Sequence, residues 1–337
     1  MKRIAIMGPF PQSHMGGSDT KTRSVYRALL NSGLISSIRT FDTSDWKKDF
    51  FKLPVWIIYE LCRCDAMIFI TGTQNFLRIL PYVLMINDWT KKKIHFIPIG
   101  DCKPEYFDEG DVKRASQIQG IYVQTEKIAD NLATLRLPNV YVMHNFKYLE
   151  TFCIEDYPCD LPLKFCYFSR ITESKGIFET IEIFAKINQN QTLCTLDVYG
   201  LIEDTARERF LELIKKHKNF VQYKGVVEAE KASNYIKDYY MMVFPTKDVG
   251  EGFPGVILDA FAAGVPSLVS RFSSFYAILH DGRDCISFSF ENYDEMYSQM
   301  CYVLTNTDKI CLMRKNCHNE YYKYDPSHEI NMITNNL

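Results

Sequence analysis

Residues 239–270, YYMMVFPTKDVGEGFPGVILDAFAAGVPSLVS, hold the pattern that decides the fold. The apolar run Met241–Phe244 predicts a buried strand, and Val265–Ser270 predicts the next one. Between them, Pro254 stands where a helix would begin and Gly264 where it would end. A strand, a polar loop, a helix and a second strand form a parallel α/β unit. In open sheets of this kind, ligands bind at the loops that follow the strands.

Two carboxylates frame this loop and helix: Glu251 precedes the predicted helix, and Asp259 stands eight residues later, inside it. Carboxylates accept hydrogen bonds from sugar hydroxyls. The backbone N–H groups of Phe253, Gly255 and Val256 lie where a helix start leaves donors without partners, so they suit an anionic ligand. Gly252 and Gly255 would let that ligand approach the backbone closely. The alternative is an ordinary helix-start acid at 251 and a partly exposed acid at 259.

The segment EGFPGVILDAFAAGVP, which begins at Glu251, resembles the E-x7-E region of retaining GT-B glycosyltransferases of family 4, the glycosyltransferase group 1 type. In that family the first Glu contacts the donor sugar and the second acid holds the ribose hydroxyls. The resemblance implies these roles for Glu251 and Asp259, and donor contacts for residues 252–255. Asp in place of the second Glu keeps the charge but shortens the reach by one methylene.

Composition bounds the class of protein. The 337 residues are 47% hydrophobic, which favours two domains, and the net charge of −2 gives no basic field for nucleic acid. The eleven cysteines show neither C-x-x-C nor zinc-ligand spacing, which predicts free thiols in a reducing compartment and no metal site. The N-terminus does not resemble a signal peptide, and no apolar run reaches transmembrane length. We therefore expect a cytoplasmic protein, soluble or at the inner face of a membrane.

Strands and helices alternate along the chain in two runs, and residues 146–162 break the alternation. Alternation of this kind predicts parallel sheets covered by helices on both faces. The expected fold is therefore α/β, with two Rossmann-like domains facing across a cleft, the GT-B arrangement. Residues 1–150 would form the acceptor-side domain and residues 151–324 the nucleotide-sugar domain. The resemblance implies that residues 325–337 form a helix packed back on the first domain.

Arg170 and Lys175 flank the loop between a predicted strand and the next helix. A guanidinium fork and a compact ammonium beside a helix N-terminus would hold a diphosphate without a metal ion. The R-x4-K-G pattern of the same family matches here as Arg170, Lys175 and Gly176. The resemblance implies that these cations stabilise the leaving diphosphate. The alternative is a pair of solvated surface cations.

The N-terminal half offers a weaker anion site, in which Gly16 and Gly17 precede a polar helix start. This is not the G-x-G-x-x-G fingerprint of dinucleotide sites. The resemblance places such a loop between the donor phosphates and the acceptor. His14 in the same loop, and Asp101 after the strand predicted at 93–99, are assigned to the acceptor side by position. The family often has His where Asp101 stands.

Two further donor contacts are positional. Val226 follows a predicted strand where the family's backbone contacts the nucleobase, and Thr246 matches a small hydroxyl near the phosphates.

Residues 46–62 combine lysines with Trp, Phe and Tyr, and lysines also follow Trp89. Such a basic aromatic stretch suits a membrane surface. The alternative is that residues 53–61 belong to the core.

The resulting hypothesis is a metal-independent, retaining glycosyltransferase of polysaccharide biosynthesis, without a cofactor. Glu251, Arg170 and Lys175 would be catalytic. The donor would be a nucleotide-diphosphate sugar, and the acceptor a glycan or lipid-linked glycan. Two alternatives stay open: a non-catalytic GT-B scaffold that binds a nucleotide or a partner enzyme, and a sugar-nucleotide epimerase.

Overall fold

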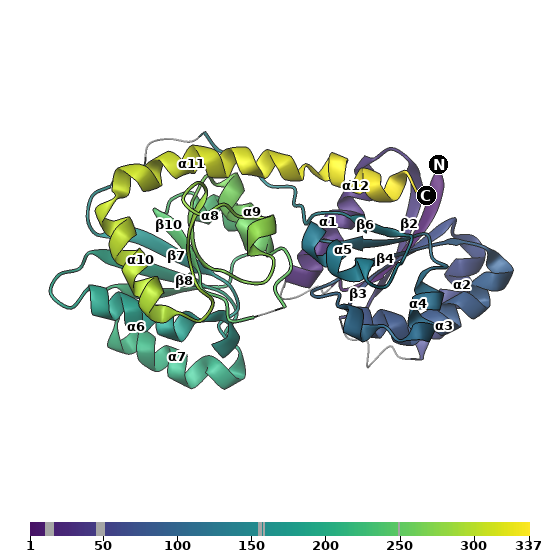
Figure 1. Ribbon diagram of the computed structural model, residues 1–337, viewed down its shortest axis with the longest axis horizontal. Coiled ribbons are helices and arrows are strands. Elements are labelled where there is room, and N and C mark those ends of the chain that lie inside the picture. Colours follow the sequence, from purple (N-terminus) through teal and green to yellow (C-terminus); the bar gives the residue numbers. More distant parts are fainter. Residues whose placement is uncertain (11–16, 45–50, 154–156, 158, 249) are drawn as a thin grey trace. The chain divides into compact units, whose positions relative to one another are not determined.

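The computed structural model describes residues 1–10, 17–44, 51–153, 157, 159–248 and 250–337 (Figure 1). The chain forms two compact units. The first contains Met1–Tyr148 and Tyr324–Leu337, and the second contains Leu149–Lys323.

The first unit is built on a parallel sheet of six strands in the order β2-β1-β3-β4-β5-β6. Its strands are β1 (Lys2–Gly8), β2 (Ile35–Asp42), β3 (Ala66–Thr71), β4 (Lys93–Pro98), β5 (Gly120–Val123) and β6 (Val140–Val142). Its helices are α1 (Gly17–Asn31), α2 (Lys52–Arg63), α3 (Thr73–Thr90), α4 (Glu109–Ala115), α5 (Glu126–Ala133) and α12 (Pro326–Thr334). Every residue of the central strand β3 is buried, as the apolar sequence AMIFIT requires of a strand covered on both faces.

The second unit repeats this architecture with the strand order β12-β11-β10-β7-β8-β9. Its strands are β7 (Leu163–Phe168), β8 (Cys194–Tyr199), β9 (Val221–Gly225), β10 (Met241–Phe244), β11 (Ser267–Ser270) and β12 (Cys285–Phe288). Its helices are α6 (Ile177–Ile187), α7 (Asp204–Lys216), α8 (Ala232–Ile236), α9 (Gly255–Ala262), α10 (Tyr293–Thr305) and α11 (Thr307–Tyr321). Short 3₁₀ turns cover Pro104–Tyr106, Glu173–Lys175, Phe275–Ala277 and Tyr322–Tyr324.

The order of strands in the second sheet reverses between β7 and β10. Strand β7 pairs with β8 on one side, and on the other side Phe165 of β7 pairs with Met241 of β10. The loops that leave two such neighbours diverge to opposite faces of the sheet, and this divergence creates a crevice at the carboxyl ends of the strands. The segments that carry Arg170, Lys175 and Glu251 are the loops after these two strands.

The C-terminal helix α12 belongs to the first unit, where it contacts α1 and β5. Asp325 caps the helix by accepting hydrogen bonds from the N–H groups of Ser327 and His328. Ile330 and Ile333 are buried in the core of the first unit. The last residues of the chain therefore complete a core whose other members come from the first 146 residues.

The predicted α/β architecture of two Rossmann-like sheets is confirmed. Helix α4 was not predicted, although Asp108 and Asp111 form a capping box at its start. The strand predicted from Val265 begins at Ser267, because the Val265 N–H bonds back to the Ala260 carbonyl in the turn after α9. In the described part of the chain, every helix falls short of the length or apolarity needed to cross a bilayer.

Candidate functional site

The loops after β7 and β10 bring together one lysine and two carboxylates. Lys175 Nζ donates to a carboxylate oxygen of Glu251, and it also donates to Asp248 Oδ2 at 3.3 Å. Thr246 Oγ1 donates to the same oxygen of Glu251 at 3.2 Å. The side chain of Lys175 is 10% exposed, so these contacts form largely out of water. The alternative of a solvated surface lysine is therefore wrong for Lys175.

Asp248 is a member of this cluster that the sequence did not single out. Its carboxylate accepts a hydrogen bond from the Gly250 N–H at 2.9 Å, and its own N–H donates to Thr246 Oγ1 at 3.1 Å. Burial raises the pKa of Asp248, but the Gly250 hydrogen bond and the positive charges of Lys175 and Arg170 outweigh burial and lower it below its usual value. Its position between Thr246 and Glu251 in a strand–helix loop was the signal that could have identified it.

Arg170 lies at the same end of the sheet with a more exposed side chain. Its guanidinium donates to Glu203 Oε1 at 3.1 Å, and the two side chains are 60% and 40% exposed. Its charge nevertheless reaches Asp248, because it helps to lower the pKa of that carboxyl group. Arg170 and Lys175 therefore act electrostatically on the same loop.

The backbone of the Arg170–Lys175 loop is fixed by hydrogen bonds from a buried tyrosine and by a close contact with the end of β10. The buried hydroxyl of Tyr167 donates to the carbonyls of Arg170 and Lys175 at 3.0 and 3.3 Å. Gly176 has φ +70°, and a Cβ at this position would lie 2.1 Å from the Pro245 carbonyl oxygen. Only glycine permits this close approach between the loop after β7 and the end of β10.

The start of α9 lies directly after Glu251. Pro254 occupies the N-cap position, and Gly255 is the first helical residue. Gly252, Phe253 and Pro254 are buried, which fixes the backbone at the helix start. Free backbone donors and the positive end of the helix dipole face the loop side of such a helix.

Asp259 lies inside α9 and is only 2% exposed. The alternative of a partly exposed acid at this position is therefore wrong. A carboxylate buried in an apolar helix is costly unless it is satisfied. The carboxylate of Asp259 therefore needs polar partners where it lies. Its contact with a ribose remains a prediction.

The remaining candidate residues lie in other segments of the chain than the cluster of Lys175, Asp248 and Glu251. Val226 is 52% exposed in the segment after β9. Asp101 follows β4, and its carboxylate pairs with Lys103 at 2.9 Å. Gly17 is the first residue of α1. His14 and Gly16 lie outside the described residues.

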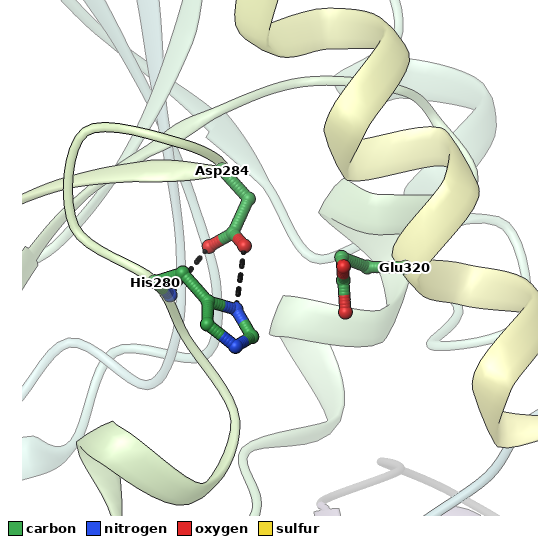
Figure 2. A group of neighbouring side chains, drawn as sticks. All are labelled: His280, Asp284 and Glu320. Carbon is green, nitrogen blue, oxygen red and sulfur yellow. Dashed lines mark hydrogen bonds and ion pairs between the residues drawn. The ribbon is translucent and has the colours of Figure 1, made fainter.

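A separate group of potential metal ligands lies near the start of β12 (Figure 2). Ligand atoms of His280, Asp284 and Glu320 lie within 4.8 Å of one another. Asp284 accepts from the His280 ring Nδ1 and from its backbone N–H, both at 2.9 Å. Glu320 pairs with Arg283 at 2.8 Å and with Lys323 at 2.7 Å. These two cations already neutralise Glu320, and the Arg283–Glu320 ion pair connects α11 to the loop before β12.

A surface cavity of about 280 Å³ lies between α6, α7 and α10, among residues that include Phe178, Arg209 and Tyr297. No residue predicted to bind the donor lines it. Most of its lining comes from helix surfaces rather than from the carboxyl ends of strands, where open sheets bind ligands. We therefore place the candidate site at the loops after β7 and β10.

Comparison with known families found one match within the second unit: residues 162–306 match the family of glycosyl transferases group 1. The matched region includes Arg170, Lys175, Glu251 and Asp259. A comparison with curated proteins found no match.

Solved structures show the fold of the whole chain. HepE from Anabaena in complex with UDP-glucose has a TM-score of 0.75 and 13% identity, and the match covers 100% of both chains. Sucrose-phosphate synthase from Thermosynechococcus elongatus has a TM-score of 0.77 and 13% identity, over 99% of this chain and 98% of that one. TarM from S. aureus, solved with UDP, has a TM-score of 0.64 and 16% identity, over 84% and 58% of the two chains. The chain therefore has the GT-B fold.

Proposed function

We propose that this protein is a retaining glycosyltransferase of family 4 that transfers a sugar from a nucleotide-diphosphate donor to a glycan or lipid-linked glycan. The observation that carries the proposal is the Lys175, Asp248 and Glu251 cluster at the point where the strand order reverses. The family match over the same unit and the resemblance in fold to structures solved with UDP and UDP-glucose support it.

Arg170 and Lys175 would hold the diphosphate. Arg170 is exposed enough to turn its guanidinium towards phosphate oxygens, whereas Lys175 is positioned by the carboxylates that it contacts. Both positive charges favour the diphosphate most as negative charge builds on it during bond cleavage. This arrangement needs no metal ion, and we propose a metal-independent reaction without a cofactor.

Glu251 would position the donor sugar through its hydroxyls, and Asp259 would accept hydrogen bonds from the ribose. The backbone of Gly252, Phe253 and Gly255 would complete this side of the donor site at the start of α9. Thr246 already contacts Glu251 and would lie near the phosphates. Val226 would contact the base through its backbone.

In the reaction, the bond between the anomeric carbon and the diphosphate oxygen breaks, and its electron pair leaves with the diphosphate. An acceptor hydroxyl oxygen forms the new bond on the same face of the sugar, and its proton passes to the departing phosphate oxygen. The donor-site residues would supply orientation and charge stabilisation, the two effects that dominate such transfers. Gly17, with His14, Gly16 and Asp101 on the acceptor side, would contribute from the first unit. The proposal also includes peripheral membrane contact through residues 46–62.

Product analysis tests this proposal. Sugar nucleotides of uridine, guanosine, adenosine and thymidine would be incubated with candidate glycan acceptors. The products would be identified by mass, and the configuration of the new bond by the NMR coupling of its anomeric proton. Free nucleoside diphosphate, together with an acceptor heavier by one sugar and retained anomeric configuration, is the expected result. An epimerised donor without diphosphate release would identify an epimerase. Tight diphosphate binding without either product would favour the non-catalytic scaffold.

A further inference from the structure

The outward face of α2 is apolar. The exposed side chains follow a helical stripe: Phe51, Val55, Ile58 and Tyr59 are 86%, 67%, 48% and 52% exposed. The opposite face, which includes Ile57 and Leu61, is buried in the core. The one carboxylate of the helix, Glu60, is also buried, so the outward face carries no negative charge.

The neighbouring helix α3 repeats this pattern. Tyr82, Met85 and Trp89 are 67%, 62% and 90% exposed, and their spacing of three and four residues places them on one side of the helix. Helices α2 and α3 lie side by side in the first unit (Figure 1). By comparison, α7 carries seven charged side chains among its 13 residues, as an ordinary surface helix does.

The charges around these two helices are strongly biased. Residues 51–63 and 73–93 contain six basic and two acidic side chains, in a chain whose net charge is −2. Arg63 donates to the Tyr59 hydroxyl at 2.7 Å and lies over its ring, so a cation and an aromatic ring are paired on the face itself. Three consecutive lysines follow Trp89 at the end of α3.

We propose that the outward faces of α2 and α3 dock the first unit on an anionic lipid bilayer. Aromatic and aliphatic side chains beside cations match the interface of such a membrane, where rings enter the headgroup layer and lysines meet lipid phosphates. Charge selects this partner over a second copy of the chain, because two copies would bring like charges together. The inference concerns a surface and does not depend on the proposed transfer reaction.

Vesicle sedimentation tests the docking without any activity measurement. The wild-type protein should sediment with vesicles that contain phosphatidylglycerol, less with phosphatidylcholine alone, and less at high salt. Changing Val55→Glu and Trp89→Glu together should weaken binding to the anionic vesicles by about tenfold or more. The matched controls Tyr276→Glu and Leu312→Glu, at positions 79% and 70% exposed in the second unit, should bind as the wild type does.

A second readout removes the dependence on the folding of the double variant. Brominated lipids should quench part of the tryptophan fluorescence of the wild type, and Trp89→Phe should abolish that part. The inference is overturned if the wild type ignores anionic vesicles or if the control variants lose binding equally. It is also overturned if the wild type is a dimer that Val55→Glu and Trp89→Glu convert to monomers.

Discussion

Lys175 and Glu251 form an ion pair between segments 76 residues apart in the chain, at adjacent strands of the second sheet. The pair exists because β7 and β10 are neighbours and because Gly176 allows their loops to approach. Asp248 shares the same ammonium group at 3.3 Å. Because one cation contacts two acids, removing a single charge changes the net charge of the cluster and hence its attraction for phosphates.

Asp248→Asn should strengthen the binding of nucleoside diphosphates. The change removes a negative charge beside Lys175 while keeping an oxygen that can accept from the Gly250 N–H. Less repulsion of the phosphates at this half-exposed position is worth about 0.3–1 kcal/mol, or roughly two- to fivefold in the dissociation constant. Calorimetric titration measures it, with Asp204→Asn as a control at an acid 99% exposed. Weaker binding would mean that Asp248 assists the ligand.

Glu251→Gln should reduce turnover far more than nucleotide affinity. The amide keeps a hydrogen-bonding side chain beside Thr246 but loses the charge that would act on the sugar in the transition state. We expect a loss of about a hundredfold in kcat, with the dissociation constant of the diphosphate changed by roughly threefold or less. Steady-state kinetics and titration separate the two quantities. Equal losses in both would reduce Glu251 to a binding residue.

Gly176→Ala should destabilise the second unit more than Gly225→Ala does. Both glycines have positive φ, +70° and +85°, so both changes carry the same backbone cost of about 1 kcal/mol. Only at Gly176 does the new methyl meet the Pro245 carbonyl, while nothing lies within 4 Å at Gly225. An additional loss of about 1–3 kcal/mol is expected from this overlap, measured by chemical unfolding. Equal losses would show that the loop shifts freely.

Lys21→Met should stabilise the first unit, and more so at low pH. Lys21 is 5% exposed, and burial lowers its pKa to about 7, while the charge of Glu329 partly opposes burial. Between pH 7 and about 10.4, the unfolded chain binds a proton that the folded protein excludes, so wild-type stability rises with pH. The advantage of the variant should therefore be largest below pH 7 and fade towards pH 10. Thermal midpoints across this range, with exposed Lys113→Met as the control, check the trend.

The sequence was sufficient for the sheets because their strands are apolar and regularly spaced. The apolar run Met241–Phe244, followed by a polar, Gly-rich loop, predicts a buried strand, and β10 occupies these residues. The same logic missed α4, where the capping pair Asp108 and Asp111 was the available signal.

The site was predicted less completely, for a physical reason. Arg170, Lys175, Glu251 and Asp259 stand in patterned segments, and the structure places Lys175 against Glu251. The contribution of Asp248 depends on which strands are neighbours, and sequence periodicity does not contain the strand order. Burial of Asp259 likewise depends on what packs over α9, which includes the distant helix α11.

The most direct test of the donor site is the affinity of UDP, GDP, ADP and dTDP for the wild type and for Lys175→Ala, each measured beside its nucleoside. Lys247→Ala is the matched control, because Lys247 is similarly shielded and pairs with Glu173 and Glu179. We expect one diphosphate to bind the wild type best, and Lys175→Ala to lose about 10- to 100-fold of that affinity while nucleoside binding is unchanged. Equal losses for diphosphate and nucleoside, or binding of neither, would contradict the assignment of this cluster as the diphosphate site.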